Sequence, residues 1–332
     1  MPKVELHKHL EGSIRLSTLL ELTAARRARL GLPEGELSAS AFIFDKPLAS
    51  LSVFIEVFFA HQVIMDSYAS IERIAYEVVE DAARENVRLL ELRYSPHFVR
   101  LHHEDLEYEQ IHAAVLRGIA RAQLRYEVGV GLIGIIDRSQ SLEEATAAMD
   151  FFLAHRADLV AVDLANDEIK FPADPFVALF AKARGAGLHV TIHAGETTAP
   201  ESVRNVRQAV EVLGATRIGH GVMSIKDDAT IELLKQRHVV LEVCPVSNYL
   251  TGLVDDLARH PIKELVARGV EVTVSTDDPG VFGHSLEQEY QRLLDLRLLT
   301  LDQLTTANRT AARASFIPDH VKRRFWDPKD LA

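Results

Sequence analysis

The chain is poor in the features that mark secreted proteins. Its 332 residues include a single cysteine, Cys244, so no disulfide can form within the chain, and a reducing compartment is the simplest expectation. The first residues lack the basic start and uninterrupted apolar run of a secretory signal. We therefore expect a cytoplasmic protein.

Long hydrophobic runs and concentrated positive charge are also lacking. The longest apolar stretch, residues 51–65, is interrupted by Glu56, His61 and Gln62 and is too short to cross a bilayer. The formal net charge is -11 and no basic run occurs, whereas a nucleic-acid partner requires a concentrated cationic face. We expect no membrane or nucleic-acid partner, and the composition leaves the oligomeric state open.

The chain does contain a regular alternation of apolar strands and amphipathic helices. With 47% hydrophobic residues it has ample material for a core. The pattern predicts eight strands. They cover residues 4–12, 88–94, 128–136, 159–164, 188–193, 217–220, 239–243 and 270–276. Strands separated by helices form a parallel sheet, and eight such units favour a closed (β/α)8 barrel, the TIM-barrel fold.

Additional helical segments are expected after the first strand and in the tail from His284 onward. An insertion at residues 34–66 carries Phe54, Phe58 and Phe59 at helical spacing, which favours core packing over a substrate lid. An open doubly wound sheet is the alternative fold, but its Gly-x-Gly-x-x-Gly phosphate motif is missing. No linker-like segment interrupts the pattern, so we expect residues 1–332 to form one domain.

The opening strand carries two histidines on one face. Alternate residues of a strand share a face, so His7 and His9 point the same way and make a chelating pair. Val4, Leu6 and Leu10 take the opposite face, where they can pack against helices. A His-x-His alone is a weak signal of metal binding, and its weight depends on residues much later in the chain.

Polar residues also stand at the ends of other predicted strands, where a (β/α)8 barrel places its functional groups. The fifth strand ends in His193 and the eighth in Asp277. Three histidines and a carboxylate, with a position left open for water, suit a borderline divalent ion such as Zn²⁺. We expect His7, His9, His193 and Asp277 to hold one zinc ion, which makes hydroxide available at neutral pH.

Three acid–base residues accompany these predicted ligands. Glu196 follows His193 by three residues, where a desolvated carboxyl group stays protonated and can donate to a substrate nitrogen. His220 ends the sixth strand and can orient or deprotonate the attacking water. Asp278 faces differently from its neighbour Asp277 and can hold a substrate. Each alone is better explained as a structural polar group, but their shared position at strand ends favours a metal hydrolase.

Two neighbouring residues have simpler interpretations. His189 lies below His193 on the same strand face, and we expect it to be buried and hydrogen-bonded inside the barrel. Cys244 stands at a strand end beside Pro245, and we expect a small buried hydrophobe.

Other reaction classes find less support. No Gly-x-Ser-x-Gly elbow or helical His-Glu-x-x-His occurs, which leaves serine hydrolases and zincins unsupported. A two-metal amidohydrolase with a modified lysine would need that lysine at the end of the fourth strand, and residues 162–166 contain none. A barrel that only binds ligands would not require the complete set of metal ligands and acid–base groups.

The order and spacing of these motifs resemble the adenosine deaminase family of the amidohydrolase superfamily. The resemblance runs from about residue 2 to the last helices. The motifs are PKVELHKHLEG at 2–12, ELRYSPH at 91–97, DLANDE at 163–168, HAGE at 193–196, GHG at 219–221, CPVSNYLTG at 244–252 and STDDP at 275–279. The resemblance implies a zinc-dependent (β/α)8 barrel that hydrolyses the 6-amino group of adenosine or 2′-deoxyadenosine, giving inosine or its analogue and ammonia.

The resemblance also implies a role for each site residue. By motif position, the four predicted ligands hold the zinc. Glu196 protonates the purine N1, His220 serves as base and electrostatic stabiliser, and Asp278 contacts N7. The substrate implied is therefore a small-molecule purine nucleoside.

Two positions depart from the usual pattern of that family. Glu11 stands where the pattern has Asp, at the residue expected to contact the 5′ end of the ribose, and Gly12 beside it is also expected to line the substrate site. Asn166 replaces a glycine whose backbone N–H would meet the purine N3. Asn tolerates a left-handed backbone better than most residues, but its side chain narrows the space.

These departures leave the exact substrate open. Glu after His-x-His also occurs in relatives that resemble adenine deaminase and 6-aminodeoxyfutalosine deaminase, the latter acting in menaquinone synthesis. Residues 249–252 and 93–96 look more like the nucleoside-acting branch. We expect adenosine as the substrate, with 6-aminodeoxyfutalosine and adenine as alternatives.

Overall fold

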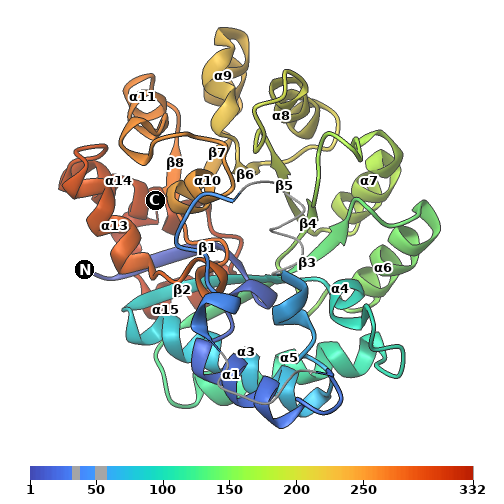
Figure 1. Ribbon diagram of the computed structural model, residues 1–332. Coiled ribbons are helices and arrows are strands. Elements are labelled where there is room, and N and C mark those ends of the chain that lie inside the picture. The colour runs from blue at the N-terminus through green and yellow to red at the C-terminus, as the bar shows by residue number, and fades with distance from the viewer. Residues whose placement is uncertain (32–37, 49–57, 332) are drawn as a thin grey trace.

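The computed structural model describes residues 1–31, 38–48 and 58–331, in which eight parallel strands form a nearly closed barrel (Figure 1). The strands are β1 (Lys3–His9), β2 (Val87–Tyr94), β3 (Gly129–Asp137), β4 (Ala161–Ala165), β5 (His189–Ala194), β6 (Arg217–His220), β7 (Val240–Val243) and β8 (Val272–Val274). Each strand pairs in parallel with the next along the chain. The predicted TIM barrel is therefore confirmed.

Helices surround this barrel (Figure 1). They are α1 (Leu16–Ala25), α3 (Tyr68–Arg84), α4 (Pro96–Arg100), α5 (Tyr108–Gln123), α6 (Leu142–Ala154), α7 (Val177–Gly185), α8 (Glu201–Glu211), α9 (Asp228–Gln236), α10 (Pro245–Leu250), α11 (Ile262–Ala267), α12 (Pro279–Phe282), α13 (Leu286–Asp295), α14 (Leu301–Ala314) and α15 (Asp319–Phe325). Within the described ranges, no helix combines the length and apolar character that a membrane span requires.

The barrel closes through a short contact between β1 and the residues just after β8. The backbone N–H of His9 donates to the carbonyl of Asp277 at 3.0 Å, and the N–H of Asp277 donates to the carbonyl of His7 at 2.9 Å. The buried Glu5 carboxylate adds a link, because it accepts the hydroxyl of Thr276 at 2.9 Å. The closure thus fixes Asp277 directly beside the two histidines of β1.

The apolar face of β1 packs outward as its alternation predicts. Val4 and Leu6 are buried in a cluster with Leu89 of β2, Ala312 of α14 and Ile317. Burial of an aliphatic side chain of this size contributes about 1.5–3 kcal/mol to folding. Because the outward face is anchored in this way, the inward face of β1 is held in one orientation.

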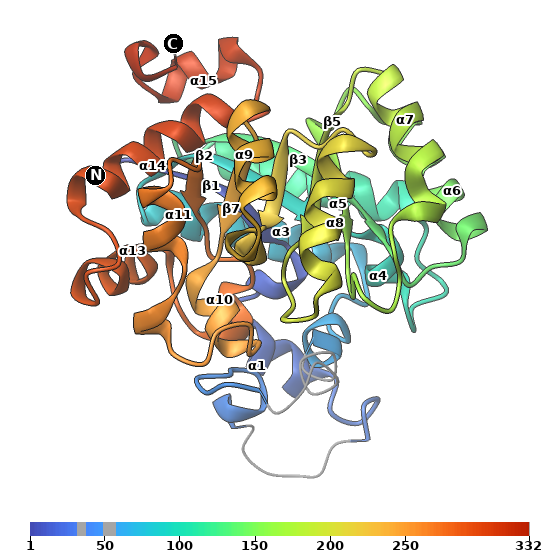
Figure 2. The same cartoon turned by 90° about the horizontal axis from the view of Figure 1, so that it is seen from above.

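The additional segments lie at opposite ends of the barrel (Figure 2). The segment after β1 contacts the helices that follow β7 and β8, since the N–H of Phe44 donates to Val281 in α12 and that of Leu48 to Leu250 in α10, both at 2.8 Å. At the other end, α15 lies beside the C-terminus (Figure 2).

The aromatic residues of the insertion pack as the helical spacing predicts. The rings of Phe58 and Phe59 lie 5.2 and 5.7 Å from that of Phe98 in α4. Both residues therefore join the packing between the insertion and α4. Phe54 lies outside the described residues.

His189 does not lie where the sequence predicts. It is the first residue of β5 and is exposed, with its ring stacked on Phe316 at 4.5 Å. The alternation places Thr191 and His193 inside the barrel, but the first residue of this strand lies beyond the buried interior. The expectation of a buried hydrogen-bonded histidine is wrong.

Candidate functional site

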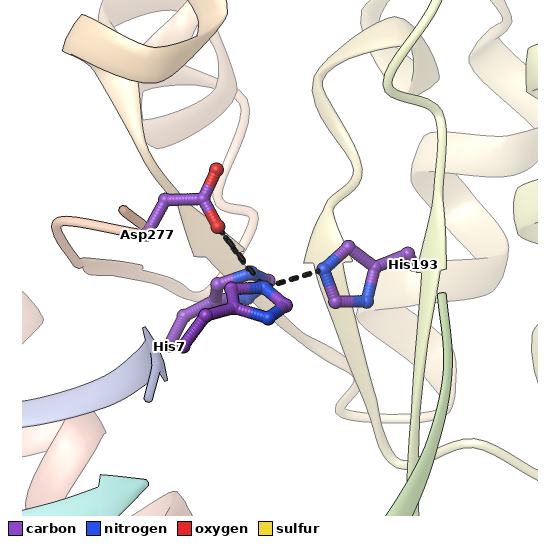
Figure 3. Close-up of side chains that lie close together, drawn as sticks. His7, His193 and Asp277 are labelled. Atoms are coloured by element: carbon purple, nitrogen blue, oxygen red, sulfur yellow. Dashed lines mark hydrogen bonds and ion pairs between the residues drawn. The ribbon is translucent and has the colours of Figure 1, made fainter. Parts of the chain in front are cut away.

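Four side chains from three parts of the barrel converge on one point (Figure 3). Nε2 of His9 lies 3.2 Å from Nε2 of His193 and 3.2 Å from Oδ1 of Asp277. Nε2 of His7 lies 3.2 Å from the same oxygen. All four side chains are buried, and their ligand atoms lie within 4.8 Å of one another. The structure therefore brings together the four residues that the sequence predicts as metal ligands.

The His7 and His193 rings each direct an Nδ1 atom away from the cluster, toward a carboxylate. Nδ1 of His7 lies 2.8 Å from Oε2 of Glu242, and Nδ1 of His193 lies 2.9 Å from Oδ2 of Asp163. Carboxylate oxygens accept hydrogen bonds, so both Nδ1 atoms carry a proton and both Nε2 atoms face the cluster. Metal-binding histidines are typically oriented by such carboxylates.

The spacing of the ligand atoms fits a divalent ion. Two nitrogens bound to a tetrahedral zinc at about 2.0–2.1 Å lie about 3.3 Å apart, close to the 3.2 Å between His9 and His193. Among the described residues, the buried Nε2 atom of His7 makes no hydrogen bond. A buried nitrogen without a partner is costly, and a bound cation removes that cost.

The charges of the cluster also suit a cation. Burial lowers the pKa of His9 to about 4, so the ring is neutral near pH 7. Burial alone would raise the pKa of Asp277, but its close contacts with His7 and His9 hold it well below its usual value. The hydroxyl of Ser247 donates to the other oxygen of Asp277 at 2.7 Å. The neutral imidazole of His9 and the ionised carboxylate of Asp277 are both suited to binding a cation.

Buried ion pairs inside the barrel support these ligands. Arg93 donates to Asp163 at 2.8 Å and to Glu242 at 2.7 Å, and Arg217 donates to Glu242 at 2.6 Å and to Glu91 at 2.5 Å. All five side chains are almost completely buried. The sequence interpretation did not assign these residues a role, although charged residues within otherwise apolar strands are a signal that could have identified them.

Glu196 lies beside the cluster at the turn after β5. The carboxylate of Glu168 accepts the N–H groups of Gly195 at 3.1 Å and Glu196 at 2.9 Å, which fixes this turn. Burial, together with the negative charges of Asp277 and Glu168, raises the pKa of Glu196 well above its usual value. The protonated form of this carboxyl group is therefore favoured, which is the direction that a proton donor requires.

His220 reaches the same space from the end of β6. Its Nε2 atom lies 3.4 Å from Oε1 of Glu196 and 3.9 Å from Oδ2 of Asp277. Its Nδ1 atom lies 3.0 Å from Nδ2 of Asn248. Burial lowers the pKa of His220 well below its usual value, so the ring is neutral.

Asp278 and Gly12 form one tightly packed unit. A Cβ atom on Gly12 would lie 1.7 Å from Oδ1 of Asp278, so only glycine leaves room for this carboxyl group. Burial and the neighbouring charges of Asp277, Glu11 and Glu196 raise the pKa of Asp278 well above its usual value. Its buried Oδ1 atom makes no hydrogen bond within the described part of the chain.

The two residues that depart from the family pattern have protein partners. The buried carboxyl of Glu11 accepts the N–H of Ser95 at 2.7 Å, and burial raises its pKa to about 7. Asn166 adopts the left-handed backbone, with φ of 88°, and its side-chain N–H donates to Asp137 at 2.9 Å. In the described residues, no hydrogen bond joins either side chain to the four ligands.

Comparison of the sequence with known proteins gives a consistent result. A family model described as adenosine deaminase matches residues 2–330. An adenosine deaminase of Escherichia coli O1:K1 is 35% identical over 327 residues, which cover 97% of this chain and 96% of the relative.

Solved structures agree with the sequence comparison. An adenine deaminase from Arthrobacter aurescens superposes with a TM-score of 0.87 at 26% identity, over 99% of this chain and 98% of that structure. An amidohydrolase from Burkholderia ambifaria with bound Zn superposes with a TM-score of 0.85 at 30% identity, over 99% of this chain and 90% of that structure.

Proposed function

The chain belongs to the adenosine deaminase family and is an aminohydrolase, and on that premise we propose that it hydrolyses the 6-amino group of adenosine or 2′-deoxyadenosine. The products are inosine or its deoxy analogue and ammonia. The observation that carries the proposal is the convergence of His7, His9, His193 and Asp277 beside Glu196, whose pKa is raised by burial and neighbouring charge. Metal ligands and a proton donor for a ring nitrogen thus share one site.

We propose that the four converging side chains bind one zinc ion per chain. Zn²⁺ suits three imidazole nitrogens and a carboxylate oxygen, and the relative from Burkholderia ambifaria contains Zn. When bound, zinc supplies a hydroxide nucleophile near neutral pH. Glu242 and Asp163 keep the His7 and His193 rings oriented for this task.

Two carboxyl groups are proposed to form hydrogen bonds with the purine ring. Glu196, kept protonated by its raised pKa, donates its proton to N1, which makes C6 more electrophilic. Asp278, whose raised pKa favours the protonated form, donates a hydrogen bond to N7. Both interactions require an aminopurine, because N1 and N7 are acceptors in that ring.

His220 is proposed to act on the attacking water. Its Nε2 atom faces the space between Glu196 and Asp277, where the water must approach C6. The substrate is then enclosed between the metal cluster and the two protonated carboxyl groups.

The sugar end of the site is proposed to lie near the two residues that depart from the family pattern. The left-handed backbone of Asn166 permits its N–H to meet the purine N3, as a glycine would. Gly12 and Glu11 lie at the edge nearest Asp278.

The single-domain organisation and the cytoplasmic location expected from the sequence stay predictions.

Free adenine is the second candidate substrate, and one observation favours it. The carboxyl of Glu11 accepts the N–H of Ser95 at 2.7 Å and is buried, so it already has a protein partner at the position where the family pattern contacts the 5′-hydroxyl. A superposable structure is described as an adenine deaminase. 6-Aminodeoxyfutalosine is the third candidate, because its 5′ substituent would also avoid that contact.

Ammonia release from four compounds tests the proposal. Zinc-loaded protein is assayed with adenosine, 2′-deoxyadenosine, adenine and 6-aminodeoxyfutalosine. We expect kcat/KM for the two nucleosides to exceed that for the others at least about tenfold, a difference of about 1.4 kcal/mol in transition-state stabilisation. The reverse order would transfer the assignment to the preferred compound, and no release from any of them would refute all of the proposed substrates.

A further inference from the structure

A line of three buried polar side chains leads from the active site into the wall of the barrel. Nδ1 of His220 lies 3.0 Å from Nδ2 of Asn248 in α10. Oδ1 of Asn248 lies 3.2 Å from Nε2 of His260. Nδ1 of His260 lies 3.1 Å from the backbone nitrogen of Ile262 at the start of α11. All three side chains are buried.

The direction of every hydrogen bond in this line follows from its far end. A backbone N–H can only donate, so the N–H of Ile262 donates to Nδ1 of His260. A ring nitrogen that accepts carries no proton, and burial keeps His260 neutral by lowering its pKa to about 3. The single ring proton is therefore on Nε2 of His260, which donates to Asn248.

The orientation of the Asn248 amide follows in turn. Its oxygen must face His260, because a flipped amide would set its N–H against the N–H of His260. Its nitrogen then faces His220 and donates to Nδ1. An imidazole that accepts at Nδ1 has its only proton on Nε2.

We infer that Asn248 and His260 are positioning residues that hold the His220 ring in the tautomer with its proton on Nε2. The role of this tautomer in catalysis rests on the proposed function, whereas the tautomer itself does not. The backbone N–H of Ile262 thus determines, through His260 and Asn248, which ring nitrogen of His220 carries the proton.

The inference changes what His220 can do for the attacking water. Nε2 of His220 faces Oε1 of Glu196 at 3.4 Å and Oδ2 of Asp277 at 3.9 Å, and it makes no hydrogen bond within the described residues. With a proton on Nε2, the ring meets the attacking oxygen as a hydrogen-bond donor. It stabilises negative charge on that oxygen and has no lone pair on that side to act as a base.

The tautomer can be measured directly by NMR. Zinc-loaded protein is labelled with ¹⁵N-histidine, and the His220 signals are assigned by their loss in a His220→Gln variant. Protonated and unprotonated ring nitrogens differ strongly in ¹⁵N chemical shift. We expect an unprotonated Nδ1 and a protonated Nε2 for His220, and the opposite pattern would overturn the inference. His112, buried between Tyr94 and Asp158, serves as the internal control in every variant.

Two positions along the line test its cause. Asn248→Asp replaces the donor facing His220 by an acceptor, so we expect the proton to move to Nδ1. His260→Gln keeps an N–H donor toward Asn248 and should preserve the wild-type pattern, whereas His260→Leu releases the amide and should populate both tautomers. Identical spectra for the His260→Gln and His260→Leu variants would overturn the assigned role of His260. If Asn248→Asp does not fold, the comparison of these two variants still tests the inference.

Steady-state kinetics of the same variants provide a separate test of the inferred tautomer. A wrong tautomer in a catalytic imidazole costs up to about 10⁴-fold in kcat. We expect Asn248→Asp to lower kcat at least about 100-fold with KM changed by less than about threefold, and His260→Gln to stay within about threefold of wild type. A wild-type protein with the expected spectrum but no deaminase activity would refute the proposed function and leave the tautomer assignment intact.

Discussion

Nδ1 of His7 lies 2.8 Å from Oε2 of Glu242, and both side chains are completely buried. Glu242 in turn accepts hydrogen bonds from Arg93 and Arg217. The carboxylate is thus fixed before any metal binds, and it fixes the ring of His7. Asp163 does the same for His193. The ligand geometry is therefore a property of the barrel interior as much as of the ligands themselves.

Glu242→Gln should weaken metal binding. The amide can still accept from His7, but it removes the negative charge that makes the ring a strong ligand, so we expect about 10–100-fold lower zinc affinity. Competition with a chromophoric chelator measures the affinity. Glu232→Gln, on the exposed surface of α9, is the matched control. Equal affinities in the two variants would show that Glu242 does not support the site.

Glu196→Gln should retain metal and lose turnover. A glutamine amide cannot deliver a proton to the purine N1, and loss of a general acid typically costs about 10²–10⁴-fold in rate. Steady-state kinetics and metal analysis are measured on the same preparation. Glu201→Gln in the first turn of α8 is the control, because its side chain is exposed. A near-normal rate for the first variant rules out Glu196 as the acid.

Gly12→Ala should damage substrate binding without removing metal. The new methyl group would meet Oδ1 of Asp278 at 1.7 Å, so the carboxyl group must move. We expect kcat/KM to fall at least about tenfold, equivalent to about 1.4 kcal/mol. Gly185→Ala in α7 adds the same methyl group where nothing lies within 4 Å. If both variants keep full activity, Asp278 does not need its present position.

The stability of the protein should fall between pH 7 and pH 5, in part through His260. Burial lowers the folded-state pKa of His260 to about 3, whereas the unfolded side chain titrates near 6.5. Between these values the unfolded state binds more protons, so stability is lost as pH falls. The expected contribution is about 2 kcal/mol between pH 7 and pH 5. Urea unfolding at pH 7 and pH 5 measures the free energy of unfolding of the wild-type protein and of His260→Gln. On going to pH 5 the variant should lose less stability than the wild type by about this amount. Equal losses in the two proteins would refute the contribution of His260.

The sequence was informative about the site because the ligands interrupt apolar strands at their ends. His7 and His9 share a strand face, and His193 and Asp277 end two other strands, so the barrel topology alone predicts that they meet. That prediction needs no knowledge of side-chain positions. The alternation of apolar and polar residues in β1 likewise predicted which of its faces points outward.

The contacts across the barrel interior were not predictable in the same way. Glu242 lies within β7 and Asp163 within β4, and their partners on β1 and β5 depend on strand register and side-chain reach. His189 was misplaced for a related reason. Its parity points inward, but parity does not reveal that the first residue of β5 lies beyond the buried interior.

The left-handed backbone at Asn166 shows an intermediate case. The tolerance of Asn for this conformation was predictable from its residue type, and the observed φ of 88° agrees. The hydrogen bond from its side chain to Asp137 was not, because it requires the ends of β3 and β4 to lie side by side.

Metal analysis of the wild-type protein and of His193→Ala tests the central claim most directly. Both proteins are purified identically, loaded with zinc and freed of excess ion before elemental analysis. The account predicts close to one equivalent of zinc per wild-type chain, and loss of zinc and deaminase activity together in the variant, because one of the four converging ligands is removed. Stoichiometric zinc in the variant, or two equivalents per wild-type chain, would contradict it.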